Sequence, residues 1–200
     1  MKKLDNTAGS LTQDEISIIY GSLLGDGYMR IMPGRKNAFL EINHSIKARE
    51  YVDYKFSLLK RLCNQPPKER NGNEGRIAYR FFTKSIAEFN EIYKMFYKDH
   101  NKVIPKIKLN SLILAIWFMD DGSRSRDSDV YLNTQQFSMN DQKKLLRMLF
   151  ELKIKARLNK DKKYYRIRIL KESIRDFNKI ISPYVIPSMQ YKLSYNPVET

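Results

Sequence analysis

The sequence has few residues that could form a disulfide or a zinc site. Cys63 is its only cysteine, and its two histidines, His44 and His100, lack the short spacing of zinc ligands. Apolar runs are also short: none reaches the roughly 18 residues that span a bilayer. The first residues lack the apolar core of a secretory signal. These absences predict a soluble intracellular protein that does not act at a membrane.

Acidic residues are scarce relative to basic ones. The chain has 37 Lys and Arg against 22 Asp and Glu, and its formal net charge is +15. Such an excess is typical of proteins that bind polyanions, of which nucleic acid is the commonest. A hydrophobic content of 42% is enough for a folded core, and 200 residues fit one large domain or two small ones.

The second half of the chain repeats features of the first. Residues 85–92 (SIAEFNEI) match residues 173–180 (SIRDFNKI) without a gap, and each copy follows a β-like run and precedes an Ile-Pro pair. Two apolar helical stretches that run into Asp-Gly also recur, at residues 16–27 and 112–122. Because these matches occur in the same order, we expect two equivalent units, residues 1–103 and 104–200.

Capping signals and hydrophobic periodicity predict a similar series of elements in each unit. In the first unit, Thr12 and Glu15 form a capping box, and we expect helices at about 13–25, 47–62 and 85–97, strands at 28–32, 38–44 and 76–83, and a loop at 65–75. In the second, we expect helices at about 111–121, 139–152 and 172–181 and strands at 123–126, 130–137, 154–159 and 164–170. The helix at 47–62 has Tyr51, Tyr54, Leu58 and Leu62 at helical spacing.

Both apolar stretches end in an acid that is unfavourably placed. Asp26 and Asp121 come at the C-terminal ends of helices, which carry partial negative charge, and directly after residues that favour burial. A single Asp-Gly pair could be a simple turn that ends a helix. Two such pairs at equivalent places indicate that a shared cation compensates them.

These two segments resemble the motifs of a known family. Residues 20–27 (YGSLLGDG) and 115–122 (AIWFMDDG) resemble the paired motifs of the LAGLIDADG homing endonucleases, and residues 132–135 (LNTQ) and 186–193 (IPSMQYKL) extend the likeness over nearly the whole sequence. The chain is similar to the intron-encoded subgroup with two motifs in one chain, which implies a monomer with no obligate protein partner.

The resemblance implies an α+β fold. We expect two pseudo-symmetric αββαββα units, with the motif helices packed at the centre and two antiparallel sheets forming a saddle for DNA. Gly21 and Gly25 lie on one helix face and would allow the second motif helix to approach closely. Ile116 and Asp120 occupy places where the family motif prefers small residues, so the contact is expected to be asymmetric.

The activity that the resemblance implies is site-specific cleavage of both strands of an asymmetric DNA target of about 20 base pairs, leaving short 3′ overhangs. Two or three Mg²⁺ ions, for which Mn²⁺ can substitute, would support the hydrolysis. Asp26 and Asp121 would bind these ions, together with the main-chain carbonyls of Gly25 and Asp120. The side chain of Asp120 is expected to meet the backbone, a neighbouring side chain or water instead.

The same resemblance implies roles for further residues. Lys102 and Lys192 match lysines that reach each active centre, although a solvated surface lysine is the alternative for Lys102. Gln135 matches a position that orients water. His44 stands where relatives often carry glutamine, and a plain histidine at a strand end fits it equally well.

Cationic and apolar residues alternate along the predicted strands, and this pattern indicates which residues contact DNA. In residues 164–169, Arg166 and Arg168 alternate with Ile167 and Ile169, so cations lie on one face of the strand. A half-exposed sheet alone could explain this pattern, but arginine on a β-ribbon is also suited to reading guanine in the major groove. The expected DNA-binding residues are Arg30, Arg35, Lys36, His44, Arg76, Arg80, Arg124, Arg126, Arg157, Arg166 and Arg168.

Three other functions fit part of the sequence. An RNA maturase that binds its intron RNA, and a DNA-binding protein of the same fold that does not cleave, both suit the fold. A basic ribosome-associated protein would explain the charge but not the paired motif. The cellular compartment stays open between an organelle such as the mitochondrion and a bacterial or phage-infected cytoplasm.

Overall fold

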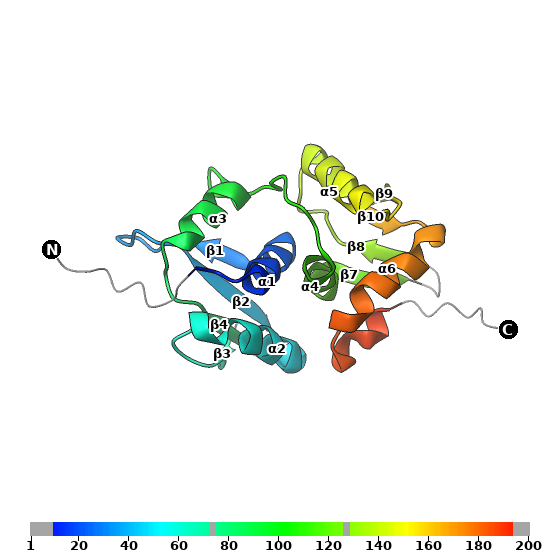
Figure 1. Cartoon of the computed structure of the whole chain (residues 1–200). Coiled ribbons are helices and arrows are strands. Elements are labelled where there is room, and N and C mark those ends of the chain that lie inside the picture. The colour runs from blue at the N-terminus through cyan, green and yellow to red at the C-terminus, as the bar shows by residue number, and fades with distance from the viewer. Residues whose placement is uncertain (1–9, 73–74, 126–128, 194–200) are drawn as a thin grey trace.

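The computed structural model describes residues 10–72, 75–125 and 129–193. Each half of the chain folds as helix, two strands, helix, two strands and helix, as predicted (Figure 1). The first half consists of α1 (Gln13–Leu24), β1 (Tyr28–Arg30), β2 (Phe39–Ser45), α2 (Arg49–Leu59), β3 (Lys68–Asn71), β4 (Ile77–Phe82) and α3 (Glu88–Phe96). The second consists of α4 (Ser111–Asp121), β7 (Gly122–Ser125), β8 (Asp129–Leu132), α5 (Met139–Glu151), β9 (Ala156–Asp161), β10 (Tyr164–Ile169) and α6 (Ile174–Ile181).

Local hydrogen bonds explain where the helices begin. The capping box predicted before α1 forms in both directions: the backbone N–H of Glu15 donates to Thr12, and that of Thr12 donates to the Glu15 carboxylate. Asn110 caps α4 by accepting from the backbone N–H of Ile113 at 2.8 Å. Ser138 caps α5 in the same way through Asp141. The sequence-based helix starts are therefore confirmed to within a few residues.

The two sheets have the same strand order. One runs β1-β2-β4-β3, the other runs β7-β8-β10-β9, and the pairings within both are antiparallel. The predicted loop at 65–75 is wrong in part, because residues 68–71 form β3. All four residues of β3 are exposed, so this edge strand has no apolar alternation, and its pairing with β4 alone defines it. A short hairpin, β5 (Tyr97–Lys98) with β6 (Asn101–Lys102), was also not predicted.

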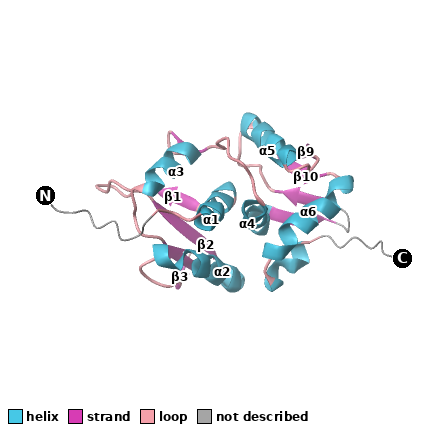
Figure 2. Ribbon diagram, in the orientation of Figure 1, coloured by secondary structure: helices cyan, strands magenta, loops and turns pink. Residues whose placement is uncertain are grey.

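The helices cover one face of each sheet (Figure 2). In the first sheet, Leu40 and Ile42 are fully buried, whereas Glu41 is half-buried and Asn43 exposed. The buried residues of both halves belong to one continuous core. Among the described residues, no helix is both long and apolar enough to cross a membrane.

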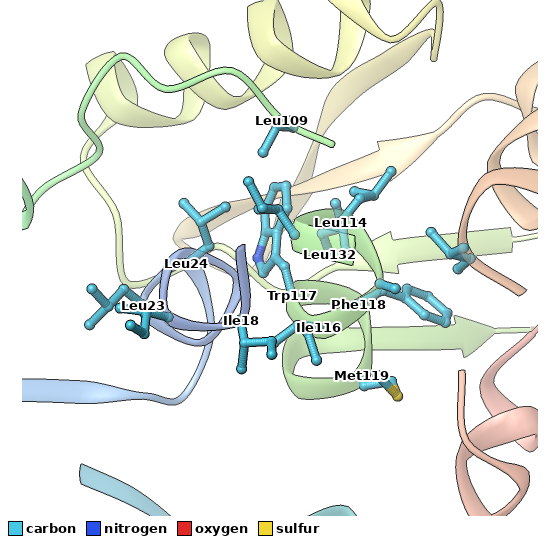
Figure 3. Close-up of a cluster of buried hydrophobic side chains, with 14 of the residues drawn as sticks. Ile18, Leu23, Leu24, Leu109, Leu114, Ile116, Trp117, Phe118, Met119 and Leu132 are labelled. Carbon is cyan, nitrogen blue, oxygen red and sulfur yellow. The ribbon is translucent and has the colours of Figure 1, made fainter. Parts of the chain in front are cut away.

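Helices α1 and α4 lie side by side at the centre, between the two sheets (Figures 1 and 3). Their close approach depends on the glycines of α1: a Cβ placed on Gly21 would fall 2.6 Å from Cβ of Ile116. A Cβ on Gly25 would fall 2.6 Å from Oδ2 of Asp120. The small residues of one helix thus accommodate large residues of the other, and the predicted asymmetry of this contact is confirmed.

Candidate active site

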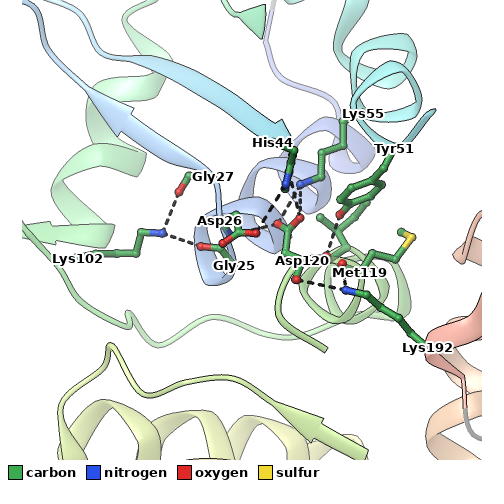
Figure 4. A network of polar contacts seen from close by, with 11 residues as sticks. Gly25, Asp26, Gly27, His44, Tyr51, Lys55, Lys102, Met119, Asp120 and Lys192 are labelled. Carbon is green, nitrogen blue, oxygen red and sulfur yellow. Dashed lines mark hydrogen bonds and ion pairs between the residues drawn. The ribbon is translucent and has the colours of Figure 1, made fainter. Parts of the chain in front are cut away.

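The acids of the two motifs meet where α1 and α4 end (Figure 4). Asp26 follows the last turn of α1, and Asp120 and Asp121 are the last two residues of α4. The backbone N–H of Asp26 donates to Oδ2 of Asp120 at 3.3 Å, which joins the two helix ends directly. Three carboxyl groups, one from the first motif and two from the second, therefore share one small region.

Asp121 is the least compensated of these acids. Burial, together with the nearby negative charges of Asp26 and Asp120, raises its pKa from 3.8 to about 8, against the opposing effect of Lys102 and Lys192. Its Oδ2 is buried and has no hydrogen-bond partner among the described residues. A buried carboxyl oxygen without a donor is costly, and a bound cation would relieve that cost.

Two lysines reach the helix ends from opposite sides. Lys102, on the β5–β6 hairpin, donates to the carbonyl oxygens of Gly25 and Gly27, both at 2.8 Å. Lys192, at the end of the short helix η6 (Pro187–Lys192), donates to the carbonyl of Met119 at 2.6 Å and to that of Asp120 at 3.4 Å. The structure thus places each predicted lysine at the motif of its own half.

Burial explains the electrostatic state of both lysines. It lowers the pKa of Lys102 and of Lys192, and the neighbouring acids only partly offset this effect. Neither lysine is a solvated surface residue, so the surface alternative for Lys102 does not describe its position. An ammonium group held by main-chain carbonyls beside carboxylates can donate to further anionic oxygen atoms.

Asp120 is bound by a residue outside the predicted set of site residues. Its side chain is fully buried, and both carboxylate oxygens accept from Lys55 of α2, at 2.7 and 2.9 Å. Lys55 is also fully buried, and its Nζ lies 4.4 Å from the centre of the Tyr51 ring. The expectation that Asp120 meets a neighbouring side chain is confirmed, and that neighbour is a buried lysine.

His44 points into this cluster and away from the outer face of the sheet. Its Nδ1 lies 3.7 Å from Asp26 Oδ2, and its Nε2 lies 3.6 Å from Asp120 Oδ1. Burial and the charge of Lys55 lower its pKa, against the opposing effect of the two acids. His44 thus belongs to the acidic cluster in this structure, and its contact with DNA stays a prediction.

Two sets of groups in this region could hold a metal ion. Ligand atoms of Asp26, His44 and Asp120 all lie within 4.8 Å of one another, but Lys55 already neutralises Asp120. Asp26 and Asp121, whose Oδ2 meets no donor in the described part of the chain, offer only oxygen atoms, which are the ligands that Mg²⁺ prefers. Gln135, predicted to orient water, donates to Asp161 at 2.9 Å, so that role stays a prediction.

The predicted DNA-binding residues differ in how they are held. Arg30 and Arg80 both pair with Glu41, at 2.9 and 3.4 Å. Arg168 pairs with Asp129, and the Arg166 guanidinium lies 4.0 Å from the centre of the Tyr131 ring. Acids on the same face thus hold several of these arginines in place.

The remaining basic residues of the set are more exposed. Arg35 and Lys36 lie in the exposed β1–β2 connection, and Arg76 and Arg157 are also exposed. Arg124 donates to the carbonyl of Leu193 at 3.2 Å. Arg126 lies outside the described residues.

Comparisons with known proteins show which sequences this chain resembles. A family model described as the LAGLIDADG DNA endonuclease family matches residues 16–177. The chain is 37% identical over 212 residues to the cytochrome b mRNA maturase bI2 of Saccharomyces cerevisiae, covering 96% of this chain but 50% of that protein. It thus spans about half the length of that relative. It is 28% identical to the probable intron-encoded endonuclease 1 of Wickerhamomyces canadensis, covering 94% and 87% of the two chains.

Solved structures with a similar fold include DNA complexes. The homing endonuclease I-WcaI bound to its DNA recognition sequence superimposes with a TM-score of 0.86 at 25% identity, covering 98% of this chain and 94% of that one. I-DmoI in complex with DNA and Mn shares the fold, with a TM-score of 0.52 at 13% identity.

Proposed function

This chain belongs to the LAGLIDADG DNA endonuclease family, and we propose that it is a homing endonuclease that makes a double-strand break at one long asymmetric site. The proposed reaction is metal-dependent hydrolysis of one phosphodiester bond in each strand, leaving short 3′ overhangs. The proposed enzyme acts as a monomer on a duplex of about 20 base pairs. The similar structure of the homing endonuclease I-WcaI, which was solved bound to its DNA recognition sequence, supports DNA as the substrate.

One observation carries this proposal: Asp26 and Asp121 flank the meeting point of α1 and α4, and no described residue donates to the buried Oδ2 of Asp121. A pKa of about 8 for Asp121 means that the folded chain accommodates its negative charge poorly when no cation is bound. Such strain is characteristic of sites built for a charged ligand. A structural turn would instead supply its own donors.

The residues that would hold Mg²⁺ are the carboxylates of Asp26 and Asp121, with the carbonyls of Gly25 and Asp120 as further oxygen ligands. When bound, the ions supply an activated water molecule and neutralise charge on the phosphate and the leaving oxygen. The oxygen-only character of these ligands fits Mg²⁺ or Mn²⁺. One carboxylate from each half suits two cuts, one in each strand.

Lys102 and Lys192 would stabilise the scissile phosphates. Each lysine has an ammonium group anchored by carbonyl oxygens next to an acid, so it can donate to an incoming phosphate oxygen with little reorganisation. Position beside the motif end, rather than charge alone, distinguishes these two lysines from the others. Substituting methionine for either one is expected to slow cleavage while leaving DNA binding nearly intact.

The outer faces of the two sheets would bind the duplex. Arg30 and Arg80 on one sheet, and Arg166 and Arg168 on the other, lie on the faces opposite the helices. Their ion pairs and ring contacts fix the side-chain directions before DNA arrives, which favours base readout over loose phosphate contact.

Cleavage of a DNA library tests the proposal. The protein is incubated with plasmids carrying fragments of the uninterrupted host genome, with Mg²⁺ and in parallel with Ca²⁺, and the ends are sequenced. A double-strand break at one site with Mg²⁺ alone is expected. Asp26→Asn and Asp121→Asn should abolish cutting but keep binding within about tenfold, or 1.4 kcal/mol. Normal cutting by either variant, or no cutting by the wild type, contradicts the proposal.

RNA binding is a second candidate function, and the outer surface of α5 favours it. Phe150 on this surface is 70% exposed. It shares one hollow with Arg147 and Lys155, and the neighbouring Lys143 is also exposed. Cations around an exposed aromatic ring suit an unstacked base of single-stranded RNA. The opposite side of α5 packs into the core, so this surface is separate from the arginines of the sheet.

The names of two relatives support this second function. Proteins of Saccharomyces cerevisiae and Debaryomyces hansenii, 37% and 34% identical to this chain, are named cytochrome b mRNA maturase bI2. These names also favour an organelle among the possible compartments. The combined variant Arg147→Ala/Phe150→Ala/Lys155→Ala should weaken binding to the intron RNA at least tenfold in gel-shift assays and leave DNA cleavage unchanged. Equal losses for RNA and DNA would contradict a separate surface.

A further inference from the structure

The two halves of the helix interface differ at one pair of equivalent positions. Asp120 follows Gly25 by 95 residues, the same offset that relates Asp121 to Asp26. Gly25 and Asp120 face each other so closely that a Cβ on Gly25 would fall 2.6 Å from Oδ2 of Asp120. Only one of these positions can carry a side chain, and the Asp120 carboxylate fills the space between the units.

In the described part of the chain, the side chains and the amide that the Asp120 carboxylate meets belong to the N-terminal half (Figure 4). Lys55 Nζ donates to its two oxygens at 2.7 and 2.9 Å, and the backbone N–H of Asp26 donates at 3.3 Å. His44 Nε2 lies 3.6 Å away. A residue of the C-terminal unit thus holds groups of the N-terminal centre.

Lys55 stands where a metal ion would otherwise be attracted. Ligand atoms of Asp26, His44 and Asp120 lie within 4.8 Å of one another, a spacing that suits a divalent ion. The Lys55 ammonium contacts both oxygens of Asp120 and is fully shielded from solvent. It therefore neutralises the carboxylate and prevents it from acting as a metal ligand.

We propose that Lys55 and Asp120 are positioning residues: the buried Lys55 ammonium, which contacts both oxygens of Asp120, keeps this carboxylate out of the metal site and commits it to holding the backbone of Asp26. A buried ion pair contributes little net stability after desolvation, so its value lies in fixing one geometry. This inference rests on the proposed endonuclease function. It implies that cleavage of the strand served by Asp26 depends on the pair more than cleavage of the other strand does.

Strand-resolved kinetics test the positioning role. A duplex of the target, labelled differently on each strand, is cut under single-turnover conditions by the wild type and by Lys55→Gln/Asp120→Asn, a neutral pair that can still hydrogen bond. We expect one strand to be cut at least tenfold more slowly than the other, so that nicked DNA accumulates, with DNA affinity within about threefold. Lys102→Met should slow the same strand. Equal slowing of both strands, or no slowing, would overturn the proposal.

A metal titration tests the internal cation without relying on cleavage. Binding of Mn²⁺ to the free protein is followed by electron paramagnetic resonance. Lys55→Gln, which frees Asp120, should bind Mn²⁺ at least tenfold more tightly than the wild type, and the double variant should return to the wild-type affinity. Equal affinities in all three proteins overturn the internal-cation role.

If the wild type fails to cut DNA, the proposed function fails, yet this titration still decides the role of Lys55. If Lys55→Gln does not fold, Asp120→Asn is compared with the double variant instead: its Lys55 ammonium, left without a carboxylate, should weaken Mn²⁺ binding relative to the double variant, and equal affinities would overturn the internal-cation role.

Discussion

Asp121 should make the protein less stable when no metal is bound, and its replacement by asparagine should reveal by how much. The folded chain raises the pKa of this carboxyl from 3.8 to about 8, mainly by burial and then by the charges of Asp26 and Asp120. Near pH 7 the pH of the solution exceeds the pKa of the unfolded chain by about three units. At 1.36 kcal/mol per unit, this difference corresponds to roughly 4 kcal/mol of folding free energy. After allowance for remaining solvent contact, Asp121→Asn should stabilise the metal-free protein by about 2–4 kcal/mol.

The sign of the pH dependence follows from the same shift. Because the folded pKa is raised, the folded state keeps a proton that the unfolded chain has lost, between the unfolded value of 3.8 and the folded value of about 8. The wild type therefore loses stability as pH rises through this window. The variant has no carboxyl at this position and lacks that loss, so the difference between the two proteins grows with pH and levels off above the folded pKa.

Thermal and urea unfolding in the presence of EDTA, at several pH values within this window, measure the effect. A gain of about 2–4 kcal/mol corresponds to a rise in Tm of roughly 5–15 °C for a chain of this size. Asp176→Asn on α6 is the matched control: its carboxylate is exposed, and the change should stay within about 0.5 kcal/mol. If Asp121→Asn is no more stable than the wild type near pH 8, the carboxyl is not strained and the argument for a cation site loses its basis.

Four further results are expected. Lys102→Met and Lys192→Met should each reduce the single-turnover cleavage rate by about 10- to 100-fold, with DNA affinity within about threefold in gel-shift assays; a loss of binding alone would contradict their role at the phosphates. Gly25→Ala should destabilise the fold by about 1–3 kcal/mol in urea titrations, because its methyl group would collide with Asp120, and an unchanged midpoint would contradict the close contact. Glu41→Gln should raise DNA affinity by about 3- to 10-fold at low salt, since it removes a negative charge beside Arg30 and Arg80, and weaker binding would mean that the orienting effect of Glu41 on these arginines outweighs its charge. Finally, Mn²⁺ should bind the complex with DNA at least tenfold more tightly than the free protein in calorimetry. Equal affinities would mean that the DNA phosphates do not offset the positive charge that the ion adds.

The sequence predicted the fold well where the signals were local and repeated. The capping box at Thr12 and Glu15 gave the start of α1, because capping depends on neighbouring residues. The edge strand β3 was missed, since all four of its residues are exposed and only its hydrogen bonds to β4 define it. Edge strands of this kind carry little pattern in their own sequence.

The spacing in residues 47–62 marked the buried face of this helix only in part. Tyr51 and Leu62 are buried and Tyr54 packs partly against the core, but Leu58 is 38% exposed. Val52, Lys55 and Leu59, which lie outside that spacing, are buried as well. Because lysine counts as a polar residue, the hydrophobic periodicity placed Lys55 outside the predicted apolar face of the helix. Only the tertiary position of Asp120, 65 residues later, explains why Lys55 is buried. The spacing Tyr51–Lys55, one helical turn apart, was the available signal, and it has no meaning without the partner acid.

The charges at the centre link the proposed metal site to DNA. Three carboxyl groups, of Asp26, Asp120 and Asp121, face three ammonium groups, of Lys55, Lys102 and Lys192. An added divalent ion would leave this buried region with an excess of positive charge, which the low local dielectric penalises. Two scissile phosphates would restore the balance, and their oxygen atoms would complete the ligand set. Metal ions and duplex should therefore bind cooperatively, so that the ions needed for hydrolysis assemble only on DNA that the two sheets already hold.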